Sequence, residues 1–188
     1  MHGSTIKRRK LKVKPATPEA LAPYGMVLGR GTSAPADMSN FYDGKVATSK
    51  PVDFVSDEDT ALSLATVQPR DLELKYLERH FKHTQTFIPL GGKPFIAVFG
   101  APTDGDMPDL DNLEAFRFDG SAGFTMHIGT WHEFPFALEA DTDLVVVLRN
   151  ETTRDLLAEN VRNNEAHGPD LDKKNLAQRA NIVFEIDP

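Results

Sequence analysis

Residues 72–100, LELKYLERHFKHTQTFIPLGGKPFIAVFG, carry the densest β-strand pattern of the sequence. Apolar and polar residues alternate over 72–76, which is typical of a strand with one buried face. The apolar run Pro94–Phe99 follows the dipeptide Gly91–Gly92, and Gly-Gly between two apolar runs favours a hairpin turn. The segment therefore predicts a β-rich fold made of short, closely connected strands.

Further short strands are expected on both sides of this segment. The 13 glycines and 13 prolines are spread along the chain, so they can supply the turns between many short elements. The expected strands are 24–28, 61–67, 113–118, 124–128, 135–138, 144–148 and 181–186. Such spacing indicates an antiparallel sandwich or barrel. We predict a mainly β fold with a few short helices, two of them near the C-terminus.

The length of 188 residues suits a single domain. Lysines and arginines crowd the segment before residue 15, and we expect residues 1–14 to form a basic, solvated arm. Residues 15–188 then form the domain. Within it, 151–180 has the pattern of a helical tail and 181–187 that of a final strand.

The composition narrows the possible partners. A formal net charge of −7 argues against a general nucleic-acid binder, which needs a basic surface. The chain has no cysteine, which excludes disulfides and thiolate chemistry. No apolar stretch approaches the roughly 20 residues of a membrane span, and no apolar segment of a signal peptide follows the basic N-terminus. We therefore expect a cytoplasmic protein without nucleic-acid or membrane partners.

Polar residues with metal-ligand chemistry occur in two clusters. The first contains Glu78, His80 and Gln85, and side chains two apart on a strand share one face. The second contains His127 and His132 on either side of a glycine turn. Taken singly, a histidine in a β-rich protein is more often a surface or core residue than a ligand. The set taken together favours a shared pocket.

The expected ligand set is one carboxylate, two imidazoles and one amide oxygen, from Glu78, His80, His132 and Gln85. This mixed nitrogen and oxygen set suits a divalent ion such as Ni, Mn, Fe or Zn. An ion with open coordination positions can act as a Lewis acid on a small substrate that offers a carboxylate and a hydroxyl. His83 is adjacent to the first cluster without an assigned role, and His167 is expected to be exposed to solvent.

Several separated blocks resemble the ureidoglycolate lyase family of the cupin superfamily. The blocks fall in order and are Leu77–His80, Thr84–Leu90, Pro108–Leu110, His127–His132 and Pro135–Ala137. The spacing from Glu78 to Gly92, and from Gly129 to His132, matches the two cupin metal motifs, although Glu78 stands where histidine is usual and Gln85 where glutamate is usual. The resemblance covers about residues 15–150.

The resemblance implies a cupin double-stranded β-helix, or jelly roll, usually a homodimer with a divalent metal such as nickel. The implied activity is cleavage of (S)-ureidoglycolate to glyoxylate and urea in purine and allantoin breakdown. Under this hypothesis the catalytic residues are His127, as proton shuttle, with His132 and Glu78. The hypothesis assigns the substrate to Gln85 and Arg149, and the metal to Glu78, His80, Gln85 and His132.

Two other functions fit the same residues. One is a metal-dependent cupin oxygenase or isomerase for another small hydroxy acid, and the other is a small-acid-binding cupin without turnover. The family commonly has an arginine in the strand that here spans 62–67, and this chain has none there. That arginine could serve the substrate carboxylate, so its absence bears on the substrate more than on the fold.

Overall fold

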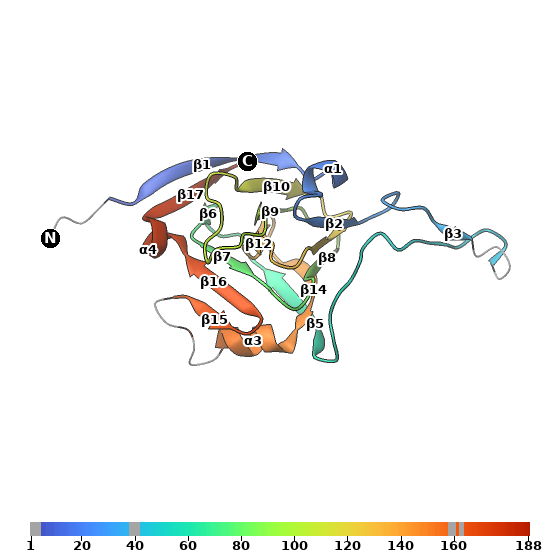
Figure 1. Ribbon diagram of the computed structural model, residues 1–188. Helices are drawn as coiled ribbons and strands as arrows, with labels where there is room; N and C mark the ends of the chain where they lie inside the picture. Colours follow the sequence, from blue (N-terminus) through green and yellow to red (C-terminus); the bar gives the residue numbers. More distant parts are fainter. Residues whose placement is uncertain (1–4, 38–41, 158–160, 162–163) are drawn as a thin grey trace.

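The computed structural model describes residues 5–37, 42–157, 161 and 164–188. Its strands form two large curled sheets around a common interior, and a small two-stranded ribbon extends away from them (Figure 1). The ribbon pairs β3 (Ala36–Asp37) with β4 (Ala47–Thr48). The helices are short. The mainly β fold predicted from the sequence is therefore confirmed.

The larger sheet has ten strands. Their spatial order is β15 (Ala166–Gly168), β16 (Leu171–Asn175), β7 (Tyr76–Arg79), β12 (Trp131–His132), β9 (Phe95–Gly100), β10 (Glu114–Phe118), β1 (Lys7–Pro15), β17 (Ile182–Asp187) and β6 (Glu73–Leu74), with β13 (Phe136–Ala137) also paired to β9. Strands β7 and β12 are neighbours in this order, so Glu78 of the first sequence cluster lies beside His132 of the second.

The smaller sheet has five strands and faces the larger one. Their order is β2 (Gly25–Leu28), β11 (Gly123–Met126), β8 (Thr86–Leu90), β14 (Thr142–Arg149) and β5 (Thr60–Val67). The described helices are α1 (Pro18–Leu21), α3 (Asn150–Leu157) and α4 (Leu176–Ala180). Helix α1 begins where the sequence requires it, because Thr17 caps its first turn and Pro18 occupies the first helical position.

The main core lies between the two sheets. Phe99 and Phe116 reach it from the larger sheet, and Phe87 and Phe124 from the smaller one. Strand β9 is buried along its whole length, because its alternate residues enter this core and a second core on the outer face of the larger sheet. This explains the uninterrupted apolar run in the sequence.

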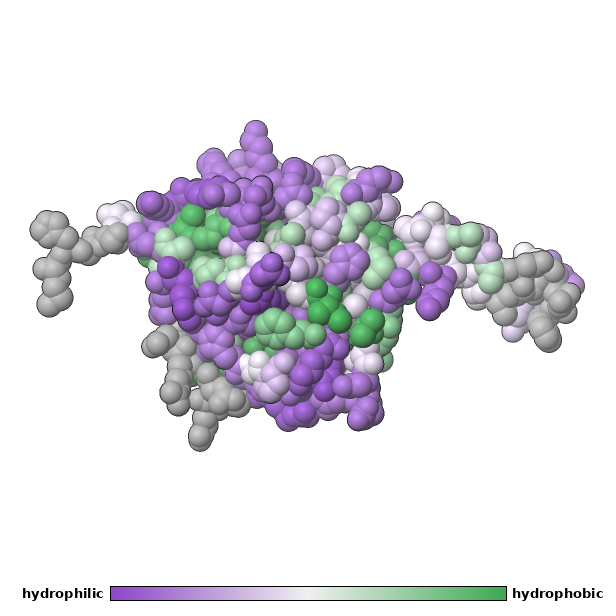
Figure 2. All heavy atoms as spheres, in the orientation of Figure 1, coloured by the Kyte–Doolittle hydropathy of each residue, from purple (hydrophilic) through white to green (hydrophobic). Residues whose placement is uncertain are grey.

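Strand β1 replaces the expected solvated arm. Its first part pairs in parallel with β17 and its last part in parallel with β10, so it joins β17 and β6 to the rest of the larger sheet. Its basic side chains remain exposed while Leu11 and Val13 pack on the second core. Figure 2 shows the hydrophilic residues gathered over this edge of the molecule. The alternation of basic and apolar residues is thus that of a half-buried strand.

The tail is only partly helical. Residues 171–175 were expected to be helical but form strand β16, which hydrogen-bonds to β7, and helix α4 begins at Leu176. The side chain of Asn175 caps that helix by accepting the N–H of Gln178. The pairing with β7 overrides the weak helical propensity of Asp-Lys-Lys.

The Gly91–Gly92 turn does not close a hairpin. Both glycines have positive φ, as a tight turn requires, but β8 before them belongs to the smaller sheet and β9 after them to the larger sheet. The turn therefore carries the chain from one sheet to the other. The sequence prediction of a turn is confirmed and that of a hairpin is wrong.

Within the described residues, no helix is both long enough and apolar enough to cross a lipid bilayer.

The position of β1 predicts that Leu11 contributes to stability. Leu11→Ala removes a partly buried side chain from the second core, and we expect the free energy of unfolding to fall by about 1–2 kcal/mol. Lys12→Ala, on the exposed face of the same strand, should change it by less than about 0.5 kcal/mol. Denaturant titration measures both. Equal stability of the two variants would show that residues 7–15 behave as a free arm.

Candidate metal and substrate site

Three adjacent strands of the larger sheet place Lys173, Glu78 and His132 in one row. Strand β7 is paired with β16 on one side and with β12 on the other, and Glu78 is the register partner of both Lys173 and His132. Residues directly opposite on paired strands share a face and lie close together. The row faces the interior. His132 is also the register partner of Phe99 on the next strand, β9, and Phe99 belongs to the core between the sheets.

His80 joins this row at the end of β7. It lies two residues after Glu78, so the strand geometry directs it to the same face. The turn before β12 is docked on it, because the N–H of Gly129 donates to the carbonyl oxygen of His80. Gly129 has a φ of +83°, a backbone conformation that glycine adopts without strain. The two sequence clusters therefore meet at this point.

The donor atoms of Glu78, His80 and His132 converge. One ligand atom from each lies within 4.8 Å of the other two. Glu78 Oε1 is 3.6 Å from His132 Nε2 and 3.9 Å from His80 Nε2. All three residues are buried. Donors that share one ion at bonds of about 2.1 Å come within about 4.2 Å of each other, so this group could hold a metal ion.

Both imidazoles present a lone pair to the group. His80 Nδ1 is 3.2 Å from the carbonyl oxygen of Asp170, and His132 Nδ1 is 3.0 Å from that of Thr130. A carbonyl only accepts, so each Nδ1 carries the proton and each Nε2 is left with a lone pair. Within the described residues, His80 Nε2 is buried without a hydrogen-bond partner. This is the tautomer found in metal-bound histidines whose other nitrogen donates to a carbonyl.

The ionisation of the group also favours a cation. Burial, followed by repulsion from His80, lowers the pKa of His132 from 6.5 to about 4, and burial also lowers the pKa of His80. Burial alone would raise the pKa of Glu78, but attraction to Lys173, His132 and His80 outweighs it and lowers that pKa to about 2. At neutral pH the group is one carboxylate between two neutral imidazoles.

Gln85 completes the expected ligand set. Its side-chain oxygen lies 2.8 Å from His132 Nε2, and the residue is buried. Two acceptor atoms at this distance need a proton or a cation between them, unless the amide is reversed so that its N–H donates. The donor set therefore fits a divalent ion, with Glu78, His80 and His132 as its ligands and Gln85 beside them.

Two predicted site residues lie outside this group. His127 Nε2 is 3.2 Å from the carbonyl oxygen of Ala22, and its side chain lines a hollow beside α1 and β2. Arg149 is held by carboxylates: its Nε donates to Asp57 at 2.9 Å, and its Nη1 contacts Asp170 at 3.1 Å and also pairs with Glu151. The structure therefore places neither residue beside the metal-ligand atoms of Glu78, His80 and His132.

Lys173 was missed by the sequence analysis. Its Nζ donates to Glu78 Oε2 at 2.9 Å and lies 3.8 Å from Glu133 Oε1. Burial would lower the pKa of Lys173, but attraction to Glu78 and Glu133 outweighs it and raises that pKa. Residues 171–175 read Leu-Asp-Lys-Lys-Asn, which has no strand alternation, and the sequence analysis attributed them to a helix.

Asp170 was also missed, and His83 was noted beside the first cluster without an assigned role. His83 is buried against the site, with its ring centroid 4.7 Å from that of His80, and its Nδ1 lies 2.9 Å from Asp170 Oδ2. By contrast, His167 has a side chain that is 49% exposed, as expected, and pairs with Asp172.

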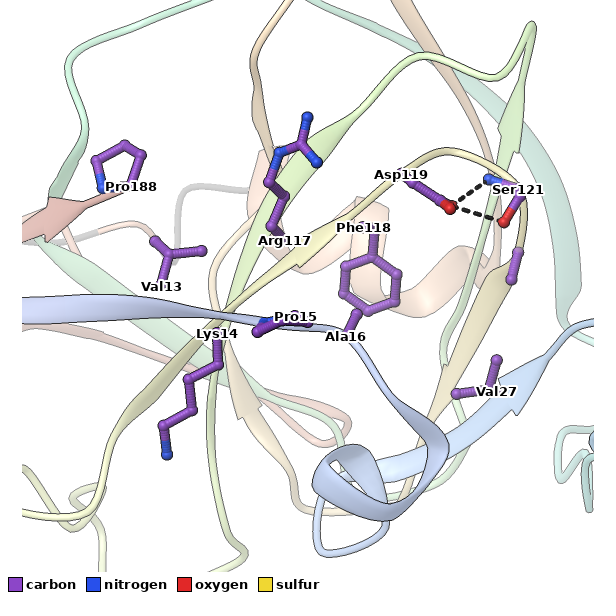
Figure 3. Close-up of a pocket in the computed structure, with 11 residues that line it drawn as sticks. Val13, Lys14, Pro15, Ala16, Val27, Arg117, Phe118, Asp119, Ser121 and Pro188 are labelled. Carbon is purple, nitrogen blue, oxygen red and sulfur yellow. Dashed lines mark hydrogen bonds between the residues drawn. The ribbon is translucent and has the colours of Figure 1, made fainter.

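The site does not coincide with the cavity of about 400 Å³ between β1, β10 and β2. That cavity is lined mainly by apolar residues such as Val13, Val27 and Phe118. In Figure 3, Lys14 and Arg117 at its rim point away from each other. Polar groups do not converge there, whereas they do at Glu78, His80 and His132.

Comparison with known proteins identifies a matching family and individual relatives. A family model described as ureidoglycolate lyase matches residues 8–178. The match extends from β1 into α4, so it includes the segment after residue 150, where the sequence resemblance was thought to end.

Individual relatives agree with the family match. The ureidoglycolate lyase of Pseudomonas syringae pv. syringae (strain B728a) is 34% identical over 145 residues, covering 76% of this chain and 84% of that protein. The ureidoglycolate lyase of Pseudomonas aeruginosa (strain LESB58) is 34% identical and that of Pseudomonas putida (strain W619) 35% identical, each over 76% of this chain and over 85% and 86% of the relative.

The lowered pKa of His132 predicts a loss of stability in mild acid. Between pH 6.5 and pH 4 the unfolded chain binds a proton that the folded chain does not, so the free energy of unfolding falls as the pH falls. We expect His132 to contribute a loss of up to about 3 kcal/mol from pH 7 to pH 4 in metal-free protein.

Denaturant unfolding at several pH values measures this loss. His132→Gln should flatten the dependence over pH 6.5–4, whereas His167→Gln, at an exposed site, should keep it. An unchanged pH dependence in His132→Gln would contradict the assigned ionisation.

Proposed function

The chain belongs to the ureidoglycolate lyase family, and from this premise we propose that it cleaves (S)-ureidoglycolate to glyoxylate and urea. The observation that carries the proposal is the family match over residues 8–178. As a member of this family the protein is an enzyme, a carbon–nitrogen lyase. The convergence of Glu78, His80 and His132 inside the sandwich supplies the polar groups that such a reaction needs.

The reaction is the collapse of a carbinolamine. The hydroxyl of the substrate loses its proton, and its electron pair forms the carbonyl group of glyoxylate. The carbon–nitrogen bond breaks, and the departing urea nitrogen takes a proton. One proton thus moves from oxygen to nitrogen overall, and no oxidant is needed. Catalysis requires groups that hold the oxygens, stabilise the negative charge on them and transfer this proton.

We assign a divalent ion, Ni, Mn, Fe or Zn, to Glu78, His80 and His132, with Gln85 beside it. When bound, such an ion supplies Lewis-acid polarisation of the substrate oxygens. His80 and His132 each keep an Nε2 lone pair because Nδ1 donates to a carbonyl, and Glu78 keeps its charge because its pKa is lowered. These residues fix where the substrate oxygens bind.

The carboxylate of the substrate needs a cation, and strand β5 offers no arginine. We assign this role to Lys173, which lies in the row with Glu78 and is more exposed than the ligands, with 22% of its side chain accessible. Arg149 was expected here, but it lies outside the row, only 9% of its side chain is accessible, and its guanidinium is bonded to Asp57, Glu151 and Asp170. The role of His127 as proton shuttle stays a prediction. Its Nε2 lies against the carbonyl oxygen of Ala22, outside the group formed by Glu78, His80 and His132.

The physiological setting is part of the same proposal. We expect a cytoplasmic homodimer that takes part in purine and allantoin breakdown, as the family resemblance implies. Light scattering of the purified protein tests the dimer, and a mass of one chain would contradict it.

The decisive assay is release of urea and glyoxylate from racemic ureidoglycolate, corrected for spontaneous decay. We expect His132→Gln to lower kcat/KM by at least about 100-fold, because it removes a metal- or substrate-contacting imidazole while preserving much of the side-chain volume. The metal content of each preparation should be measured, and chelated protein should be assayed again with Ni²⁺ or Mn²⁺.

His167→Gln is the matched control, because it removes an exposed imidazole on β15, three strands away from β12 in the sheet. It should retain wild-type activity. A folded His132→Gln that cleaves at the wild-type rate would defeat the site. A wild-type protein that does not accelerate cleavage with either metal would defeat the proposed substrate.

A further inference from the structure

Asp170 lies in the turn between β15 and β16 and is completely buried. Its Oδ1 accepts the backbone N–H of Phe81 at 3.1 Å and that of Lys82 at 2.7 Å. These two residues follow the end of β7 and have no strand partner for their N–H groups. One carboxylate therefore takes the place of a neighbouring strand and holds the chain immediately after His80.

The same residue contacts two imidazoles. Its backbone oxygen accepts the Nδ1 proton of His80 at 3.2 Å, and its Oδ2 lies 2.9 Å from His83 Nδ1. The two rings are 4.7 Å apart between centroids. Within the described part of the chain, the Nε2 atom of each ring is buried without a partner. Asp170 thus leaves both histidines with a lone pair on the nitrogen that does not face it.

Arg149 keeps Asp170 charged. Its Nη1 contacts Asp170 Oδ2 at 3.1 Å, and its Nε is fixed by Asp57. Burial would raise the pKa of Asp170, but the hydrogen bonds from His83 and Arg149 outweigh it and lower that pKa. An ionised carboxylate can only accept, which is what the two N–H groups and the ring nitrogen of His83 require.

We propose that Asp170 is the positioning residue of this site, which sets the direction of His80 and the tautomers of His80 and His83. It acts through the 80–83 segment and contacts neither metal nor substrate. Hydrogen bonds to the second nitrogen of a histidine ligand orient the ring and raise metal affinity. The effect on metal affinity rests on the metal site assigned under the proposed function, whereas the effect on the tautomers does not.

Asp170→Asn tests the proposal with little change in volume. The amide oxygen can still accept from Phe81 and Lys82, but the amide N–H₂ then faces His83 and Arg149, which are donors. His83 must move its proton to Nε2 in order to accept from this amide. We expect that switch in long-range ¹H–¹⁵N NMR spectra of metal-free protein. We also expect a fall of about 10–100-fold in the affinity for Mn²⁺ or Co²⁺.

Glu165→Gln is the matched control. Glu165 is a buried carboxylate just before β15, and it bonds to Arg179 and to the N–H of Asn175, none of which touches the site. This variant should keep both imidazole tautomers and the wild-type metal affinity. A loss of affinity equal to that of Asp170→Asn would show a general effect of disturbing the hairpin and would overturn the proposal.

The wild-type protein gives a test that does not depend on the variant folding. Its metal-free NMR spectrum should show His80 and His83 protonated at Nδ1, and protonation of either at Nε2 overturns the proposal. A folded Asp170→Asn with unchanged tautomers and metal affinity also overturns it. If the wild type binds neither Mn²⁺ nor Co²⁺, the proposed metal site fails, and the tautomers alone decide the role of Asp170.

Discussion

The buried charge of Glu78 is the constraint on which the site depends. A carboxylate removed from water is costly unless it is paired and hydrogen-bonded, and here the charged partner, Lys173, comes from the neighbouring strand β16. Lys173, on β16, donates a hydrogen bond to one carboxylate oxygen of Glu78. The imidazoles of His132 and His80 lie close to the other oxygen. The order β16, β7, β12 in the sheet thus places an ammonium group, a carboxylate and an imidazole side by side in the site. A change in the register of either pairing would leave the carboxylate without its partners.

The part of the site that is local in sequence could be predicted. Glu78 and His80 share a face because they are two apart on one strand, and His132 follows a glycine turn that returns the chain to β7. Lys173 and Asp170 could not be assigned in this way, because their place depends on a pairing across about ninety residues. The polar residues of β16 have weak strand propensity, and they form a strand because they hydrogen-bond to the edge of β7.

The same distinction explains the errors in the fold. A Gly-Gly turn with positive φ is compatible both with a hairpin and with a connection between two sheets. Here β8 pairs with β14 and β9 pairs with β10, so the two strands that flank the turn belong to different sheets. Likewise, the lysines and arginines of β1 indicate exposure, but between Lys10 and Lys14 the alternate residues Leu11 and Val13 are partly buried. The apolar residues between them were the signal for a strand, and its neighbours, β17 and β10, are distant in sequence.

The order of the larger sheet also bears on synthesis of the protein by the ribosome. Strand β1 is synthesised before the other described strands, yet one of its two neighbours, β17, is synthesised after all of them, and the strand that carries Lys173 is synthesised shortly before β17. A nascent chain that already contains Glu78, His80 and His132 still lacks the hairpin that neutralises and orients them. Completion of the binding site therefore waits for synthesis of the β15–β16 hairpin, so a product truncated before this hairpin would contain the ligands without the groups that hold them in place.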